Sequence, residues 1–301
     1  MTSSRMRKFL IMASVLFLAA FSLQGQEALP FTRIDRNPVT SAFAGAGSAS
    51  MGNVAWSAFS NASVLPFFDG TLDAAVSYQS WAPELSGAMH VNAGVAFKVM
   101  PQLGVSVGYA LQKEAELEGF HPSDQVVALG LAYGLGEKWA LGLNGRFASQ
   151  KLTESVGYSG LSGDVYVAFQ PSEALRLTAG VSTLGMNVVD QAEEPYRQPA
   201  SAKVAADWAP HFSDAFGLDI LVDGDYYFSG NYGVSVGSEL SWNKMVFLRG
   251  GYRYATEMCV IPGHIGLGAG FKFAGFRVDV SWLTGSLALK NTLCAGLGYS
   301  F

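Results

Sequence analysis

Beyond its first 25 residues the chain lacks any apolar run long enough to form a membrane helix. A helix that crosses a bilayer needs about 20 predominantly apolar residues, and Gly, Asp, Lys or Arg interrupts every such stretch after residue 25. Helical spans are therefore excluded there. The one long apolar run, residues 9–23, follows Arg5, Arg7 and Lys8, which predicts a cleaved secretory signal peptide over residues 1–25.

Charge and cysteine are also scarce. Only 14% of the residues are charged, 50% are hydrophobic and 35 are glycine, which is unusual for a soluble enzyme. The two cysteines, Cys259 and Cys294, indicate no disulfide framework, and neither lies near the predicted cleavage point, so no lipid-anchored N-terminus is expected. The net charge of -5, without a basic stripe in the mature chain, excludes a nucleic-acid partner.

Signatures of enzymes and of metal sites are missing as well. No nucleophile or acid–base group stands in a recognisable motif with an orienting partner. The four histidines show no repeated ligand spacing, and the grouping of Met258, Cys259 and His264 is interpreted as a coincidence within one loop. No catalytic residue, metal ligand or cofactor is therefore predicted.

What the chain does contain is strict alternation of apolar residues with small or polar ones, from residue 70 to the end. Runs of about ten residues suit tilted membrane strands better than the shorter strands of a soluble sandwich. Because only a closed sheet satisfies its backbone in lipid, the pattern predicts an all-β, transmembrane antiparallel β-barrel of about 14 strands over residues 70–301. The predicted strands are 70–80, 88–99, 102–112, 124–135, 138–150, 161–170, 173–183, 201–209, 215–227, 231–242, 244–255, 263–273, 275–283 and 289–301.

In these strands the alternate positions that are not apolar carry charges of both signs in nearly equal number. On a barrel this face lines the lumen. A pore that selects one ion sign would show a ring of one charge, so balanced charges favour paired networks that hold a plug and brace the wall. The predicted luminal network comprises Arg146, Arg176, Asp219, Asp223, Glu239, Arg249, Arg253, Arg277 and Asp279.

The alternate apolar positions of the strands are expected to contact outer-membrane lipid, with aromatic girdles near the strand ends. The last strand ends on Tyr299 and Phe301, which resembles the terminal aromatic signal by which barrel assembly machinery recognises outer-membrane barrels. Tight connections at residues 100–101, 136–137, 171–172, 243 and 274 should face the periplasm, and the longer ones should face outward. The predicted location is therefore the outer membrane of a Gram-negative cell.

Residues 26–69 do not alternate and form a compact, loop-like segment of small residues. A fourteen-strand barrel encloses more space than its own side chains fill, since about eight strands is the size at which they suffice. We therefore expect this segment to be a plug. Its glycines lack the Lys-Ser/Thr that follows in a phosphate-binding loop, so they indicate tight packing. The predicted plug residues are Asn37, Gly45, Gly47, Asn61 and Pro66.

The order of these features resembles the PorV/PorQ family, relatives of the FadL fatty-acid channels. The resemblance lies in the Gly-rich residues 44–49, in Asn61-Ala62-Ser63 where the family usually has Asn-Pro-Ala, and in the first strand's end at residues 76–81. It is visible again at residues 163–166 and 279–282. The resemblance implies a plugged outer-membrane barrel that acts with type IX secretion machinery or with secreted client proteins.

Two functions remain open at this point. In the first, outward loops bind secretion partners, and the loop at residues 184–200 is the most plausible contact because it carries the apolar residues Met186, Val188, Val189 and Tyr196 among acids. In the second, the barrel is a FadL-like passive transporter of hydrophobic molecules, with an opening toward lipid where Gly224 interrupts the strand at residues 222–225. A purely structural barrel is the third alternative.

Overall fold

The computed structural model describes residues 27–301, apart from residues 53, 84–87, 117–118, 190–194 and 212. The predicted signal peptide lies outside the described residues. No helix among the described residues is long and apolar enough to cross a membrane.

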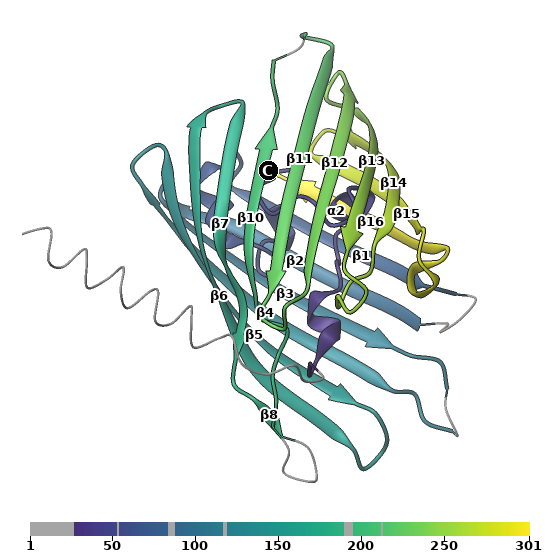
Figure 1. Ribbon diagram of the computed structural model, residues 1–301. Coiled ribbons are helices and arrows are strands. Elements are labelled where there is room, and N and C mark those ends of the chain that lie inside the picture. The colour runs from purple at the N-terminus through teal and green to yellow at the C-terminus, as the bar shows by residue number, and fades with distance from the viewer. Residues whose placement is uncertain (1–26, 53, 84–87, 117–118, 190–194, 212) are drawn as a thin grey trace, which may run out of the picture.

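Fourteen antiparallel strands form one closed barrel, in which each strand pairs with its sequence neighbours and β1 pairs with β16 (Figure 1). A separate two-stranded sheet, β8 (Val188–Val189) with β9 (Pro195–Tyr196), lies between β7 and β10 in the chain. The wall strands are β1 (Leu72–Trp81), β2 (Ala88–Met100), β3 (Leu103–Lys113), β4 (Ser123–Leu135), β5 (Trp139–Lys151), β6 (Gly157–Ser172), β7 (Leu175–Gly185), β10 (Ser201–Trp208), β11 (Phe216–Tyr227), β12 (Tyr232–Trp242), β13 (Val246–Ala255), β14 (His264–Phe273), β15 (Phe276–Thr284) and β16 (Thr292–Ser300).

The predicted barrel of fourteen strands is confirmed, and each predicted strand overlaps one observed strand. The largest difference is at β6, which begins at Gly157 and includes Pro171 and Ser172. The turn predicted at residues 171–172 is therefore wrong, and the chain reverses at residues 173–174 instead. The β6–β7 pairing shifts register between Phe169 and Ser172, and this irregularity lets the strand continue through Pro171.

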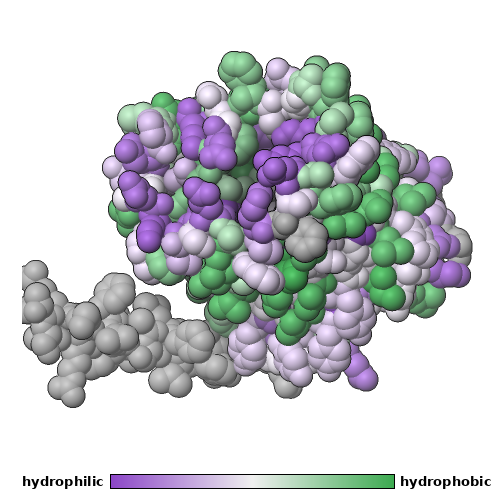
Figure 2. Space-filling model, turned by 90° about the horizontal axis from the view of Figure 1, so that it is seen from above, coloured by the Kyte–Doolittle hydropathy of each residue, from purple (hydrophilic) through white to green (hydrophobic). Residues whose placement is uncertain are grey.

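The outer face of the barrel is apolar. Along β4 the residues alternate strictly between buried and exposed, and Val127, Leu129 and Leu131 are among those that point outward. Figure 2, seen from above, shows hydrophilic residues gathered on one end of the molecule and hydrophobic residues on its flanks. Such an exterior belongs in hydrocarbon, so the polar groups of these strands can point only inward.

Strand β1 begins, and strand β16 finishes, on the side of the barrel where the turns between strands are short. The carbonyl of Phe301 accepts hydrogen bonds from the backbone N–H groups of Thr71 and Leu72, at 2.6 and 2.9 Å. The predicted terminal aromatics Tyr299 and Phe301 point outward, and the Tyr299 ring lies 4.8 Å from that of Phe276. We call this the short-turn end and the opposite one the long-loop end.

The N-terminal segment lies inside the barrel (Figure 1) and is partly helical, although the sequence predicts a loop. It contains η1 (Pro30–Arg33), α2 (Pro38–Ala42), η2 (Val54–Trp56) and η3 (Ala62–Phe67), and a further short helix, η4 (Leu287–Leu289), lies between β15 and β16. The helices form because Asn37 and Asn61 cap α2 and η3, their side chains accepting from the N–H groups of Val39 and Ser63. These capping roles were not recognised in the sequence.

Glycines on the inner wall let the plug approach closely. A Cβ on Gly251 would collide with the backbone of Phe43, and one on Gly266 would collide with the carbonyls of Ser41 and Ala42. The predicted plug glycines act differently, because Gly45 and Gly47 have φ of +88° and +133° and turn the chain after α2.

The wall is irregular at β7, not at the position predicted. Residues 222–225 of β11 are paired on both sides without a register shift, so the predicted break there is wrong. A β-bulge instead places Ser182 and Thr183 of β7 inward together, with Thr183 at φ +58°. Nothing in the local sequence marks this bulge, because neither residue is a glycine.

The close contact between plug and wall generates a prediction. Gly251→Ala should lower the free energy of unfolding by about 1–3 kcal/mol, because the added methyl group overpacks a rigid backbone contact. Chemical denaturation of the purified protein in detergent measures the effect. The matched control is Gly145→Ala on β5, where a Cβ meets nothing within 4 Å. Equal stability of the two variants would contradict the close packing of the plug.

Candidate functional site in the barrel lumen

A cavity of about 130 Å³ lies between the plug and the wall. The plug contributes residues 32–37, the turn after α2, and Trp56, Phe59 and Ser60. The wall contributes side chains from both halves of the barrel, including Arg146 on β5 and Arg253 on β13. The cavity is therefore inside the lumen and is bounded by polar as well as aromatic groups.

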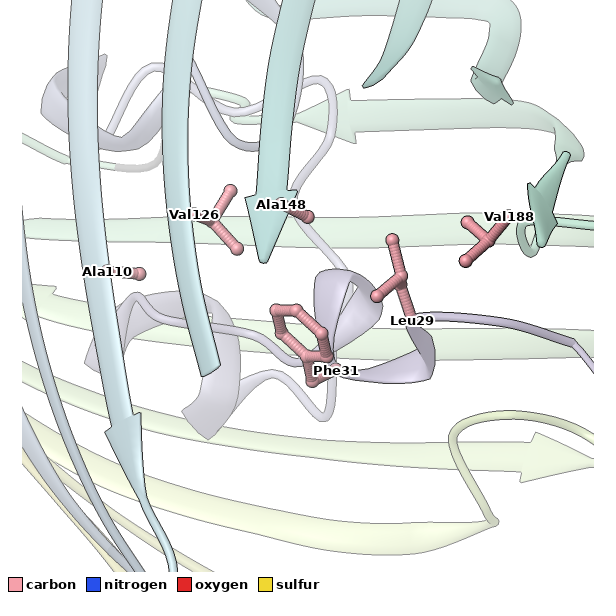
Figure 3. Close-up of a cluster of buried hydrophobic side chains, with 6 residues drawn as sticks. All are labelled: Leu29, Phe31, Ala110, Val126, Ala148 and Val188. Atoms are coloured by element: carbon pink, nitrogen blue, oxygen red, sulfur yellow. The ribbon is translucent and has the colours of Figure 1, made fainter. Parts of the chain in front are cut away.

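A hydrophobic cluster closes the lumen toward the long-loop end (Figure 3). Leu29 and Phe31 of the plug pack against Val188 of β8 and against small or β-branched residues of the wall. The strand pair β8–β9 is held over the plug by two hydrogen bonds from the Gln198 side chain, to the carbonyls of Leu161 and Met186, at 2.9 and 3.0 Å. We call this cluster the outer closure; its members are Leu29, Phe31, Ala110, Val126, Ala148 and Val188.

The second half of the plug fills the lumen toward the short-turn end. Asn144 of β5 accepts from the N–H of Ala62 at 3.1 Å and donates to the carbonyls of Ser57 and Ala58 at 2.7 and 2.9 Å. Beyond it, Leu65 and Pro66 lie against Gly104 and Gly134, near the short-turn ends of β3 and β4. This inner closure is held by packing and neutral hydrogen bonds.

The turn after α2 is held by a charge. The carboxylate of Asp223 accepts hydrogen bonds from the N–H groups of Gly47 at 2.9 Å and Ser48 at 3.1 Å. Lys203 donates to the Ser48 hydroxyl at 3.1 Å and lies 4.0 Å from Asp223. Successive backbone N–H groups form a favourable site for an anion, so the turn encloses this carboxylate.

A second carboxylate, Asp225, is shared by three cations. Arg33 of the plug, Lys203 of β10 and Arg253 of β13 approach it at 3.3, 3.3 and 2.9 Å. Burial opposes the charge of Arg33, but Tyr227 and Asp225 outweigh it and raise the pKa of the guanidinium above its usual range. The plug is thereby fixed to three wall strands through one buried carboxylate.

Arg36 is the exception among these cations. Its guanidinium donates only to backbone carbonyls of the plug, those of Phe31, Thr32 and Ile34, and lies 5.0 Å over the Phe59 ring. Burial lowers the pKa of Arg36 to about 10, and the nearby charge of Arg146 adds to that effect. Arg36 is therefore still charged at neutral pH and has no counterion within ion-pair distance among the described residues.

The predicted luminal charges lie in several separate groups. Arg249 contacts Glu239 at 2.5 Å and Asp279 at 2.6 Å, and Arg277 contacts Asp73 at 2.8 Å. Arg176 lies 3.5 Å from Asp207 and donates to the plug carbonyl of Ala49 at 2.8 Å. Of the predicted set, Asp219 makes no ion pair with a described residue.

Arg146 and Asp164 form an ion pair at the bulge of β7. Asp164 also accepts from the backbone N–H of Thr183 at 2.6 Å and from the Ser182 hydroxyl at 3.2 Å. A side-chain carboxylate thus occupies the gap in the strand pairing, directly beside the cavity that Arg146 and Ser182 line.

The loop predicted to bind partners is divided between two environments. Met186 and Val189 are 75% and 54% exposed, whereas Val188 is 4% exposed and belongs to the outer closure. Tyr196 of β9 is partly buried. The acidic residues predicted around them, 190, 193 and 194, lie outside the described residues.

The sequence reading missed the residues that the plug contributes to the cavity. Arg33, Asp35 and Arg36 were not singled out, although they are three charges in a segment otherwise made of small and apolar residues. That contrast is the signal that could have found them. Asn144 carries no such signal, since its role depends on the plug backbone opposite it. Within the described part of the chain there is no group of three His, Cys, Asp or Glu side chains that could hold a metal.

Several solved structures share this architecture. The CymD monoaromatic hydrocarbon channel matches with a TM-score of 0.62 and 12% identity, over 89% of this chain and 98% of its own. The Ralstonia pickettii toluene transporter TbuX matches with a TM-score of 0.59 and 13% identity, over 93% and 99%. A Pseudomonas aeruginosa FadL homologue gives 0.52 and 12%, over 88% and 95%. This chain has a FadL-like fold.

At these identities the FadL-like likeness concerns the fold, and the PorV/PorQ part of the resemblance stays a prediction. No protein-family model matches the sequence, and no curated protein matches it significantly. Of these neighbours, CymD is named as a channel and TbuX as a transporter.

The contact between Asp223 and the plug generates a second prediction. Asp223→Ala should raise the hydrogen-exchange rates of the Gly47 and Ser48 amides about tenfold or more, because each loses a charged acceptor worth about 1.5–3 kcal/mol. Exchange measured by mass spectrometry on peptides that cover residues 44–50 tests this. The control is Asp219→Ala, which removes a luminal carboxylate of the same strand that touches no plug amide. Unchanged exchange in Asp223→Ala would rule out the anchor.

Proposed function

We propose that this protein is an outer-membrane channel for the passive entry of small, largely apolar molecules, with the cavity of about 130 Å³ as an intermediate binding position. The observation that carries the proposal is this cavity, which lies inside the lumen between the plug and the wall. A purely structural barrel would be expected to have a lumen that side chains fill completely. An open lumen would serve an ion-selective porin better.

The size of the cavity supports a small ligand. An engineered protein cavity of about 150 Å³ binds benzene, so the cavity here has room for a molecule of about one ring. The fold supports the same class, because the neighbours include proteins named as hydrocarbon and toluene channels. The outer closure consists of few side chains, so modest movement of residues 29–31 would admit a ligand from the long-loop end.

The bulge of β7 supplies a second step in the proposed route. Where Ser182 and Thr183 both point inward, the backbone pairing between β6 and β7 is interrupted and a carboxylate fills the gap. Leu161 and Val165 of β6 face outward there, at 58% and 49% exposure. Arg146 and Ser182 line the cavity, so a ligand there would lie beside this bulge. In this proposal the short turns face the periplasm.

The outer closure generates a test of the channel. Vesicles with a lipopolysaccharide outer leaflet, which slows the entry of apolar molecules, should take up toluene faster with the protein than without it. Val188→Ser should raise this influx several-fold further, because a polar group disrupts the hydrophobic cluster. The matched control is Val189→Ser on the same strand, whose side chain is 54% exposed and outside the cluster; it should behave as wild type. Influx at background in both wild type and Val188→Ser would contradict the channel.

A second candidate follows the PorV/PorQ resemblance, in which the protein binds secretion-machinery components or secreted clients. One observation favours it: Met186 and Val189 leave exposed apolar surface on the long loop. The neighbours named above favour the channel instead.

Co-purification from native membranes distinguishes the two. A secretion-system partner that is retained by wild type and lost from a Met186→Ser, Val189→Ser variant would support the second candidate. Absence of such a partner from wild type would count against it. The double variant keeps Val188, so the outer closure stays intact and toluene influx serves as the control for folding.

A further inference from the structure

The charges that line the lumen cavity do not balance. Five lining side chains are cationic, whereas the lining carboxylates are Asp35 and Asp225. Asp225 already serves three of the cations. Two further carboxylates outside the lining, Asp164 and Asp223, form ion pairs with lining cations. A third, Asp124 on β4, attracts Arg36 without reaching ion-pair distance. The five lining cations are Arg33, Arg36, Arg146, Lys203 and Arg253.

Arg36 is the lining cation that forms no ion pair within 4 Å with a described residue, although Asp35 and Asp124 attract it. It is 7% exposed and makes no ion pair with any described residue, and its only acceptors are carbonyls of its own segment. A buried charge without a partner is costly, so a site that keeps one favours the arrival of an opposite charge. Arg36 lines the cavity, and it also lines a smaller neighbouring pocket together with His90 and Asp124.

Asp35 attracts Arg36 but forms no ion pair with it. One of its oxygens accepts from the Thr40 hydroxyl at 2.7 Å and from the N–H of Asn37 at 3.1 Å, which turns it toward α2. Its other oxygen has no hydrogen-bond partner among the described residues. Burial raises the pKa of Asp35 above its usual range.

The rest of the lining suits a flat apolar ring. Trp56 and Phe59 of the plug and Trp81, Tyr166 and Tyr227 of the wall border the same space. Two of these rings already lie beneath guanidinium groups, Phe59 beneath Arg36 at 5.0 Å and Tyr227 beneath Arg33 at 5.2 Å. The cavity therefore combines aromatic surface with excess positive charge, in a volume of about one ring.

We propose that the cavity selects a single-ring aromatic carboxylate, whose carboxylate pairs with Arg36 while its ring lies among the aromatic residues. This rests on the proposed channel function and narrows its substrate from apolar molecules in general to compact aromatic anions. A long-chain carboxylate would carry the same charge but exceed the cavity. A neutral aromatic compound would fill the cavity but leave Arg36 unpaired.

Calorimetric titration of the purified full-length protein with sodium benzoate tests the proposal, with benzyl alcohol as the neutral analogue and decanoate as the long one. Wild type should bind benzoate more tightly than either. Arg36→Gln should weaken benzoate binding about tenfold or more and leave benzyl alcohol unchanged, because only the anion loses a charge-assisted contact. Lys98→Gln on β2, a cation that does not line the cavity, should match wild type.

A second pair of variants guards against misfolding of Arg36→Gln, since Arg36 also braces the plug backbone. Ser60 lines the cavity with an exposed side chain. Ser60→Asp places a competing carboxylate there and should weaken benzoate binding severalfold, whereas Ser60→Asn, of nearly the same shape, should not.

Three outcomes would overturn the proposal: benzoate binding no tighter than that of benzyl alcohol, tighter binding of decanoate, or equal effects of Ser60→Asp and Ser60→Asn. Any of these combined with toluene influx through wild type would leave the channel standing and reject only the aromatic-anion preference. Benzoate binding without influx of toluene or benzoate would reject the channel and keep the aromatic-anion preference. The cavity would then be a binding site in a barrel that does not transport.

Discussion

Polar side chains on a lipid-facing barrel can point only inward, and the lumen must neutralise whatever they carry. Here the apolar parity of every wall strand faces out, so the charges of the strands are concentrated in a space with little water. A buried charge needs a partner. The plug supplies partners in two ways: backbone N–H groups enclose Asp223, and Arg33 joins the cations around Asp225. Plug and wall are thus held together by the same requirement.

This arrangement explains why the lumen is neither open nor solid. The plug half that follows Trp56 is fixed by Asn144 and by close contact with wall glycines, and it fills the short-turn end. The plug half that precedes Trp56 is fixed by charged contacts, those of Arg33 with Asp225 and of the Gly47 and Ser48 amides with Asp223. The cavity lies beside these charged groups. The outer closure packs the plug against the wall nearer the long-loop end. A small-molecule channel is the function that uses each of these features.

The sequence predicts the wall better than the contents of the lumen, for a physical reason. Alternation reports which face of a strand meets lipid, so all fourteen strands could be found from it. The plug has no such period, and its helices depend on caps such as Asn37 and on partners such as Asp223 that are far away in the chain. The prediction of a strand break near Gly224 failed because Asp223 and Asp225 reach the plug from a regular strand. The actual bulge at Thr183 is stabilised by Asp164, which sequence spacing does not reveal.

We infer that a plug, held in place by charges of the wall, closes the lumen of the wild-type protein. Single-channel recording of the purified protein in planar lipid bilayers tests it most directly, since a fourteen-strand barrel without its plug would conduct ions. Wild type should show no steady conductance, and transient openings should appear once Asp223 is replaced by Ala. A steady ohmic conductance in wild type, unchanged by that replacement, would contradict it.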